Sequence, residues 1–202
     1  MDAGGNLIVT DARLDGETVG LRAVAGRIEA IGPEVGAEPG ADPGFERLDA
    51  AGAPLCPPLV NGHTHAAMTL FRGHGDDLPL MRWLNEAVWP VEARLEADDV
   101  YWGTRLACLE MVRSGTVAFW DMYWQPEAAA RAVTDAGLRA VIGPPMISAR
   151  SAKERAENDR ALIEQLDAVA GFGPRIGSAV APHSIYTVDS DGLELAGALA
   201  AE

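Results

Sequence analysis

Residues 57–65 read PPLVNGHTH, a short apolar run that ends in two histidines one residue apart. Side chains of a β-strand alternate between its two faces, so a strand over Leu59–His65 projects His63 and His65 from the same face. Imidazole is a good ligand for zinc and related metals, and a catalytic zinc usually takes three protein ligands and a water. The pattern therefore predicts half of a metal site at the end of a strand. The alternative is a pair of surface histidines near a turn, but the apolar run and the adjacent Gly62 favour the metal.

The composition excludes several kinds of partner. The chain has 202 residues, of which 48% are hydrophobic, and a formal net charge of −14. Its arginines are scattered and form no basic stripe, whereas a nucleic-acid backbone needs clustered positive charge, as does an anionic membrane. We therefore expect no nucleic-acid and no membrane partner, while a small nucleoside or heterocycle is compatible with this charge.

The N-terminus has neither the basic region nor the apolar core of a signal peptide. No apolar run approaches the roughly 18–20 residues of a membrane span. Two cysteines, Cys56 and Cys108, are too few for a disulfide framework, and we expect both to be reduced and buried. These observations predict a cytoplasmic location.

The first part of the chain has the pattern of short strands. Leu7–Val9 is rich in β-formers, and turn signals at Asp15-Gly16 and Ala25-Gly26 are flanked by alternating apolar residues. We expect a small antiparallel β unit with a surface loop over 33–44 and an edge strand near Phe45–Asp49. This segment is too short to bury a good core alone, so it is expected to pack against another part of the protein.

Beyond His65 the pattern changes. A polar loop is followed by apolar residues at near-helical spacing over Leu80–Glu92, where Pro90 is expected to end or kink the helix. A helix is expected over Glu96–Ser114, with Gly115 as its C-cap. The remaining strands are expected over Thr116–Met122, Leu138–Ile142 and Ile176–Ala181, and the remaining helices over Glu127–Ala136, Ala152–Ala170 and Ser190–Glu202.

A strand followed by a helix thus occurs four times, which predicts a parallel sheet covered by helices. This order fits the start of a doubly wound sheet or half of an eightfold barrel. His63, His65, Asp121 and His183 all lie where a strand ends, and that rim carries the active site of a (β/α)8 barrel, so the barrel is favoured. A complete barrel takes about 250 residues, and Leu59–Glu202 offers about half of them. We therefore expect the chain to be a fragment of a longer protein.

Several motifs, taken in order, resemble the amidohydrolase superfamily and within it the cytosine-deaminase/chlorohydrolase-like branch. This branch includes 5′-methylthioadenosine and S-adenosylhomocysteine deaminases. The resemblance covers essentially the whole chain. Its motifs are Pro58–His65, Met68-Thr69-Leu70, Arg72-Gly73, Asp76–Leu84, Trp89–Glu92 and Ala181–Tyr186.

The resemblance implies a metal-dependent (β/α)8 barrel flanked by a small β-sandwich. Residues 1–58 would form the N-terminal sandwich segment, and residues 59–202 about four βα units of the barrel. The resemblance also implies one divalent metal, usually zinc, held by His63 and His65 and by a histidine and an aspartate from later strands. The metal would supply a hydroxide that attacks a carbon of an aminated purine-like ring, and ammonia would leave.

The same resemblance places the catalytic acid/base glutamate beyond residue 202. No catalytic residue is therefore assigned within this chain, and we expect the isolated chain to be inactive. Two histidines rarely hold a catalytic zinc, and half a barrel leaves a sheet edge unpaired.

Three residues match substrate-binding positions of the branch. Trp83 matches a tryptophan that lines the substrate pocket, Glu92 a glutamate that contacts ribose hydroxyls, and His183 a substrate-contacting histidine. The resemblance implies that the third histidine ligand of the metal comes one strand after His183. Taken singly, these three residues would be a packed aromatic, a solvated carboxylate and a loop histidine, and the motifs around them favour the substrate roles. For Asp121, a structural role in the barrel and a role in the site both stay open. No role is assigned to His74.

One departure bears on the substrate. S-adenosylhomocysteine deaminases carry arginines after the third strand to hold the amino-acid carboxylate, whereas this chain has Gly143–Met146 at the first expected place. Arg150 or Arg155 could serve the second place, so a substrate that bears homocysteine is in doubt.

The expected partner is a small-molecule substrate, and homo-oligomerisation of the full-length protein is left open. Two alternatives to the deaminase also stay open. One is hydrolysis of another C–N or C–Cl bond, as in triazine chlorohydrolases, and the other is a non-catalytic truncated scaffold.

Overall fold

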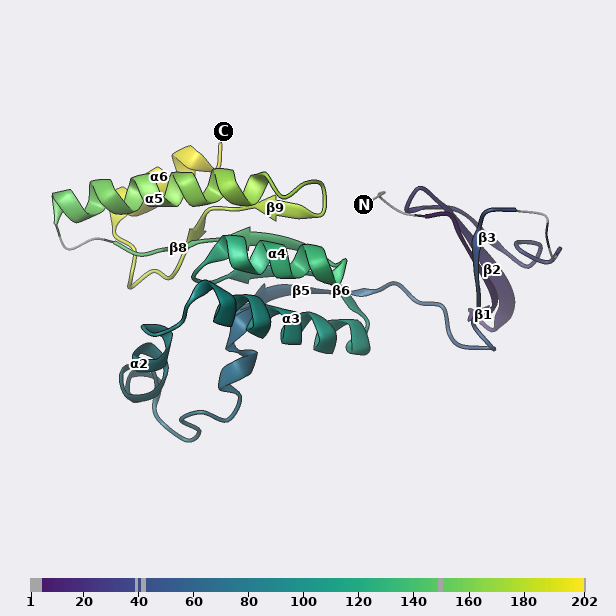
Figure 1. Cartoon of the computed structure of the whole chain (residues 1–202), viewed down its shortest axis with the longest axis horizontal. Coiled ribbons are helices and arrows are strands. Elements are labelled where there is room, and N and C mark those ends of the chain that lie inside the picture. Colours follow the sequence, from purple (N-terminus) through teal and green to yellow (C-terminus); the bar gives the residue numbers. More distant parts are fainter. Residues whose placement is uncertain (1–4, 39, 41–42, 149–150, 202) are drawn as a thin grey trace. The chain divides into compact units, whose positions relative to one another are not determined.

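The computed structural model describes residues 5–38, 40, 43–148 and 151–201 of the chain. Two compact units result, Met1–Pro57 and Pro58–Glu202, which are described separately (Figure 1). This division lies one residue before the boundary expected at residue 58. Among the described residues, none of the helices combines the length and the apolar character that a membrane crossing requires.

The first unit is a four-stranded sheet in the order β3-β2-β1-β4. Its strands are β1 (Leu7–Leu14), β2 (Glu17–Val24), β3 (Arg27–Gly32) and β4 (Glu46–Asp49). The turns at Asp15-Gly16 and Ala25-Gly26 have positive φ at all four residues, as two-residue hairpin turns require. The predicted hairpins are therefore confirmed.

The last strand corrects the expected topology. β4 pairs with β1 in parallel, with Leu7 opposite Glu46, so the unit is not wholly antiparallel. After β3 the chain crosses to the far edge of the sheet before β4 begins, and it then runs in the direction of β1. The buried apolar side chains in the described part of this unit are Ile8, Ala12, Val19 and Leu21, which form only a small core.

The two cysteines differ in their environments. Cys56 is exposed, so its expected burial is wrong; it lies in the segment 55–58, which forms neither helix nor strand. Cys108 is 1% exposed, and burial raises the pKa of its thiol to about 11. It remains protonated near neutral pH and behaves as a small core residue.

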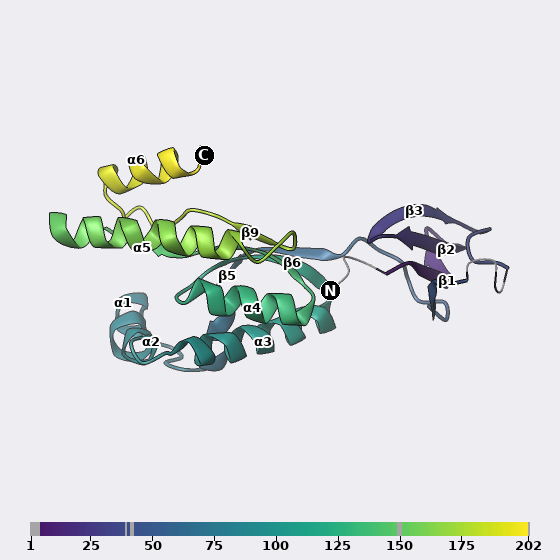
Figure 2. The same ribbon diagram turned by 45° about the horizontal axis from the view of Figure 1, so that its top comes forward.

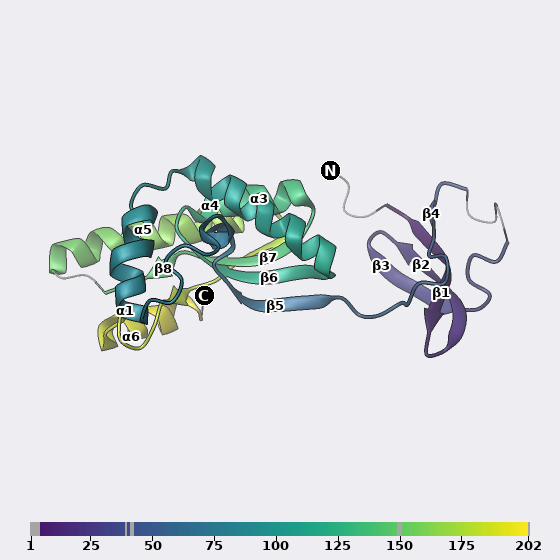
Figure 3. The ribbon, with the colours of Figure 1, turned by 90° about the horizontal axis from the view of Figure 1, so that it is seen from below.

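The second unit contains a parallel sheet in the order β5-β6-β7-β9 (Figure 3). Its strands are β5 (Leu59–Thr64), β6 (Thr116–Met122), β7 (Arg139–Gly143) and β9 (Ile176–Ser178). Since β5 and β9 each have one paired neighbour in the described sheet, both are edge strands. The expected unpaired edge is therefore present.

A helix follows each strand region, as predicted. These helices are α3 (Ala97–Ser114), α4 (Pro126–Ala136), α5 (Ala152–Ala170) and α6 (Ser190–Leu199). α3 begins with a capping box between Glu96 and Asp99, and it ends at Gly115 with φ of 82°. α4 contacts both α3 and α5, so the three helices form one layer against the sheet (Figure 3).

The main core lies between this helical layer and the sheet. Small side chains on α4, such as Ala129 and Ala130, are buried there and allow the helix to approach its neighbours closely. Larger core residues come from α3, α5 and the strands; they are Val100, Phe119, Ile142 and Val169. α6 packs on α5 through a separate cluster that includes Met146, Leu162 and Ala196 (Figure 2).

Two strands are interrupted near their carboxyl ends. β7 stops at Gly143, and the chain continues as β8 (Pro145–Met146), which pairs in parallel with β10 (Ala181–Pro182). The strand expected over Ile176–Ala181 is therefore divided into β9 and β10. Pro144 has no N–H to continue a ladder, which fits a break at this position.

The segment after β5 is largely helical. It contains the 3₁₀ helix η1 (Ala66–Phe71), then α1 (Leu80–Arg82), the π-helical turn η2 (Trp83–Val88) and α2 (Trp89–Glu92). The N–H of Trp89 donates to the carbonyl of Leu84, five residues earlier. Pro90 therefore does not end the helix; a π turn directly before it widens the helix instead.

Gly103 allows η1 to lie against α3. A Cβ at this position would be 2.6 Å from the carbonyl oxygen of Ala67 and 3.0 Å from its Cα. Thr69 Oγ1 donates to the Gly103 carbonyl at 2.9 Å across the same contact. The close approach fixes the segment that directly follows His65.

Gly103→Ala should therefore destabilise the chain although alanine is the better helix former. Overpacking costs about 1–3 kcal/mol, and a 2.6 Å contact with a backbone oxygen favours the upper part of this range, above the gain of about 1 kcal/mol in helix propensity. Gly197→Ala in α6, where a Cβ has no neighbour within 4 Å, is the matched control and should stabilise the chain. Urea unfolding of both variants measures the difference, and an equal gain in stability from both would contradict the packing argument.

Candidate metal and substrate site

The carboxyl ends of the strands and the helical segment Leu80–Glu92 surround a cavity of about 190 Å³. Four of the five residues predicted for the site line it, and the fifth, His63, precedes His65 at the end of β5. The four are His65, Trp83, Glu92 and His183. The structure thus brings together residues that are up to about 120 positions apart in the sequence.

The two histidine rings lie side by side. Their centroids are 5.1 Å apart and their planes meet at 80°. His63 is within β5 and His65 directly follows the strand, so the alternation of side chains along β5 brings both rings to one side. This is the arrangement that the His-x-His pattern predicts.

The ring of His65 is oriented by the neighbouring strand. Its Nδ1 lies 2.7 Å from the carbonyl oxygen of Met122, the last residue of β6. A carbonyl oxygen can only accept, so Nδ1 carries the proton and donates it. In the neutral ring the lone pair is then on Nε2, the atom that remains available to a metal.

Asp121 holds the two neighbours of His65, Thr64 through its side chain and Ala66 through its backbone. Its side chain is fully buried, and Oδ1 accepts from Thr64 Oγ1 and from the Ala66 N–H, both at 2.8 Å. Oδ2 is buried and has no hydrogen-bond partner among the described residues. Burial raises the pKa of Asp121, although these hydrogen bonds and the nearby His65 oppose the shift. The open question about Asp121 is therefore answered in structural terms: it anchors the His65 segment.

This donor set suits part of a zinc site. Two imidazoles on one side of a strand end supply nitrogen ligands, and one of them is oriented by a second group, as is usual for metal-binding histidines. The described part of the chain contains no group of three or more His, Cys, Asp or Glu side chains that could hold a metal. The residues present thus fit two of the three protein ligands that a catalytic zinc usually has.

Glu92 is held by a residue that the sequence patterns did not single out. The hydroxyl of Tyr123 donates to Glu92 Oε1 at 2.8 Å, and both residues line the cavity. Tyr123 directly follows β6 and is 3% exposed. Its position two residues after Asp121, at the same strand end, is the signal that could have identified it.

His183 follows β10 on the same cavity. Its Nδ1 lies 2.9 Å from Thr187 Oγ1. Burial lowers the pKa of His183, and the nearby His65 lowers it further, while Glu92 raises it. The ring is therefore neutral near pH 7 and offers a substrate one hydrogen-bonding nitrogen.

Trp83 and His74 fix the loop that precedes the helical segment. Trp83 Nε1 donates to the carbonyl of His74 at 3.1 Å, and His74 Nε2 lies 3.3 Å from the carbonyl of Ala87. Gly75, with φ of 73°, packs against Trp83 and Ala87. His74 thus has a structural contact, while Trp83 presents part of its ring to the cavity.

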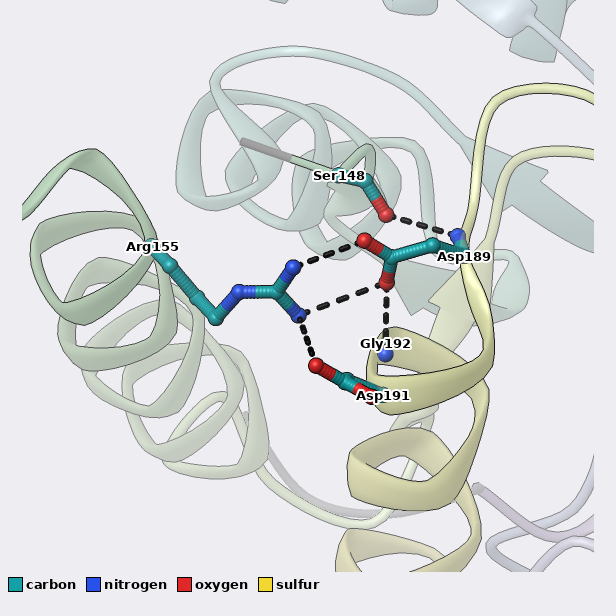
Figure 4. Close-up of polar contacts among 5 residues, drawn as sticks. All are labelled: Ser148, Arg155, Asp189, Asp191 and Gly192. Atoms are coloured by element: carbon teal, nitrogen blue, oxygen red, sulfur yellow. Dashed lines mark hydrogen bonds and ion pairs between the residues drawn. The ribbon is translucent and has the colours of Figure 1, made fainter. Parts of the chain in front are cut away.

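Arg155 is already paired with carboxylates. Its guanidinium contacts Asp189 through Nη2 at 2.7 Å and Nη1 at 3.3 Å, and Nη1 lies 3.7 Å from Asp191 (Figure 4). Asp189 also caps α6 through the Gly192 N–H, so this cluster joins α5 to the start of α6. Arg150, the other arginine considered for a substrate carboxylate, lies outside the described residues.

The profile of the amidohydrolase family matches residues 55–202. The chain belongs to the amidohydrolase family. It is similar to a 5′-deoxyadenosine deaminase of Methanoregula boonei, with 49% identity over 77% of this chain and 35% of that protein. It is also similar to a 5-methylthioadenosine/S-adenosylhomocysteine deaminase of Symbiobacterium thermophilum, with 42% identity over 88% of this chain and 41% of that protein. The amidohydrolase chain thus spans well under half the length of these relatives.

Solved structures support the same fold. An adenosine deaminase from Xanthomonas campestris with bound zinc aligns with a TM-score of 0.82 and 32% identity, over 98% of this chain and 47% of that chain. A zinc-complexed atrazine chlorohydrolase from Arthrobacter aurescens aligns with a TM-score of 0.78 over 96% of this chain and 50% of that chain. At 16% identity, the second likeness concerns the fold alone. The second unit is therefore part of an amidohydrolase (β/α)8 barrel, as predicted.

Asp121→Ala should destabilise the chain strongly. The substitution leaves the buried Ala66 N–H without its acceptor, at a cost of about 1–3 kcal/mol, while the Thr64 hydroxyl keeps only the carbonyl of Trp120. The exposed Asp76 provides the control, since Asp76→Ala should change stability by less than about 0.5 kcal/mol. Urea unfolding measures both changes; similar midpoints for the two variants would show that Asp121 anchors nothing.

The ion pair between Arg155 and Asp189 should make the free energy of unfolding depend on pH in the acidic range. Hydrogen bonding to Arg155 is the largest of the causes that hold the pKa of Asp189 well below its usual range. A depressed folded-state pKa stabilises the fold above the unfolded value of about 4, and this contribution is lost as the pH falls below it.

Asp189→Asn keeps a good N-cap for α6 and removes the charge. Its stability deficit relative to the unmodified chain should be present at about pH 7 and shrink toward about pH 3. Asp98→Asn, at a carboxylate that is 87% exposed, is the charge-matched control. A deficit of Asp189→Asn that stays constant over this pH range would refute the ion-pair explanation.

Proposed function

We propose that this chain is part of a metal-dependent hydrolase that deaminates an aminated purine-like ring or nucleoside, of the 5′-methylthioadenosine or 5′-deoxyadenosine type. The observation that carries the proposal is the meeting of His65, Glu92 and His183 in one cavity, with His63 beside His65. Nitrogen ligands for a metal thus lie next to groups that can bind the hydroxyls and ring nitrogens of a nucleoside.

In this proposal His63 and His65 contribute two ligands to a single divalent ion, and zinc is the candidate. When bound, such an ion acts as a Lewis acid that activates water at neutral pH. The Nδ1–H bond from His65 to the Met122 carbonyl keeps Nε2 free for this role. The zinc bound in the similar adenosine deaminase from Xanthomonas campestris supports the choice of metal.

The other residues would bind and orient the substrate. Trp83, together with Trp89 and Trp124, gives the cavity aromatic walls suited to a planar ring. The Glu92 carboxylate can accept hydrogen bonds from sugar hydroxyls. The neutral imidazole of His183 can hydrogen-bond the base.

The charge of the site bears on which nucleoside it binds. Arg155 already pairs with Asp189 and Asp191, so its charge is compensated within the fold. This favours a nucleoside with an uncharged 5′ substituent over one that carries an amino-acid group. A carboxylate-bearing substrate stays an alternative through Arg150.

A hydrolase of chlorinated triazines is the second enzymatic alternative. Such a substrate has no hydroxyls for a carboxylate to bind, so the Glu92 side chain in the cavity favours the nucleoside. A non-catalytic scaffold is the third alternative, and the metal and ammonia measurements below separate it from both enzymes.

The complete gene product, loaded with zinc, should release ammonia from 5′-deoxyadenosine or 5′-methylthioadenosine. His63→Ala or His65→Ala should weaken zinc binding by at least about 100-fold, because each removes a ligand and not merely a supporting group. His74→Ala removes a histidine outside the proposed metal pair and should leave zinc affinity unchanged. The 202-residue chain alone should release no ammonia. The proposal would be contradicted if neither His63→Ala nor His65→Ala weakened zinc binding, or if neither nucleoside were deaminated.

A further inference from the structure

We propose that Tyr123 positions the Glu92 carboxylate toward the vicinal hydroxyls of a nucleoside and so determines specificity for them. This inference rests on the proposed function, since it concerns the same cavity. It extends that function to a residue outside the sequence motifs.

A hydrogen bond joins the end of the Tyr123 side chain to the end of the Glu92 side chain. The Tyr123 hydroxyl is 2.8 Å from Glu92 Oε1, an ordinary length for an O–H donor and an oxygen acceptor. Tyr123 is 3% exposed, so its ring is fixed by packing and its hydroxyl has a defined direction. Glu92 is the last residue of α2, and its long side chain has many rotamers unless something restrains it.

The direction of the hydrogen bond is also fixed. Burial raises the pKa of Tyr123, and the neighbouring Glu92 carboxylate raises it further. The phenol therefore stays protonated and donates, while the carboxylate accepts. Hydrogen bonds to an ionised acceptor are roughly twice as strong as those between neutral groups, so this contact can hold the glutamate in one rotamer.

One oxygen of Glu92 remains for a ligand. Within the described residues, Oε2 has no hydrogen-bond partner, whereas Oε1 has Tyr123. An ionised carboxylate has about four lone-pair sites, so most of its accepting capacity is unused. Two adjacent hydroxyls of a ribose could therefore both donate to this carboxylate while Tyr123 holds it through Oε1.

Tyr123 also lies near the proposed metal ligands. Its ring centroid is 6.3 Å from that of His65, with the planes tilted by 44°. One buried side chain is thus near the histidine that would hold the metal and hydrogen-bonds the carboxylate that would hold the sugar. A change at Tyr123 should therefore affect how the sugar is held relative to the reacting ring.

The test compares two substrates in the zinc-loaded complete gene product. One is 5′-deoxyadenosine, and the other is its analogue without the 2′- and 3′-hydroxyls. Tyr123→Phe should lower kcat/KM for 5′-deoxyadenosine about tenfold, the size expected for one charge-assisted hydrogen bond. It should leave kcat/KM for the analogue nearly unchanged, because that substrate does not use Glu92.

The chain offers a matched control. Tyr101 donates to Asp135 Oδ2 at 2.8 Å, a contact of the same chemistry between α3 and α4 that does not line the cavity. Tyr101→Phe should leave the ratio of the two kcat/KM values unchanged.

A double-variant cycle then tests whether Tyr123 acts through Glu92. Glu92→Gln alone should lower discrimination between the substrates, and adding Tyr123→Phe should change it little further.

The outcomes separate this inference from the proposed function. If the unmodified enzyme deaminates neither substrate, the proposed function fails. If it deaminates 5′-deoxyadenosine and Tyr123→Phe lowers both substrates equally, or neither, the positioning role is overturned and the proposed function stands. Full additivity of Tyr123→Phe and Glu92→Gln would likewise overturn it.

Discussion

The hydrogen bond from His65 Nδ1 to the carbonyl of Met122 is the contact on which the arrangement of the site depends. It exists because β5 and β6 pair in parallel with Thr64 opposite Asp121, which brings the residue after β5 beside the last residue of β6. The carbonyl direction is set by the sheet, so the imidazole is oriented by secondary structure and not by another mobile side chain. Any shift in the register of β5 would move His65 away from the Met122 carbonyl and so remove the acceptor.

Three consecutive residues at the end of β6, Asp121 to Tyr123, position the side chains of the site. Asp121 holds the Thr64 side chain before His65 and the Ala66 backbone after it, Met122 orients the ring, and Tyr123 holds Glu92. Asp121 and Tyr123 act through their side chains, whereas Met122 between them acts through its backbone carbonyl. One strand end can therefore position both the proposed metal ligand and the proposed sugar-binding carboxylate.

Local patterns were sufficient for most of the barrel units. The helix over Ala97–Ser114 could be read from its acidic first turn, its apolar spacing and Gly115, all of which lie within one segment. The His-x-His pair was predictable for the same reason, since strand alternation alone puts two rings on one side. The hairpins of the first unit followed from their turn residues.

Features that depend on distant segments were not predictable in this way. The parallel pairing of β4 depends on where the chain goes after β3, and the exposure of Cys56 depends on what covers residues 55–58. The role of Tyr123 depends on Glu92, which belongs to a helical insertion about thirty residues earlier. No periodicity within either segment encodes that meeting, so the contact becomes visible only in three dimensions.

The buried Oδ2 of Asp121 shows where local stability is given up for the site. Replacing this carboxylate with an apolar residue would remove an unsatisfied oxygen, yet it would also free the backbone around His65. Both accepted hydrogen bonds go to Oδ1, so Oδ2 is buried without contributing to either of them. The unsatisfied atom is thus best understood as the consequence of anchoring two neighbours of a histidine with a single short side chain. Sequences that specify a fold break local rules mainly at functional or strained sites, and in this chain the exception is bonded to both neighbours of a proposed metal ligand.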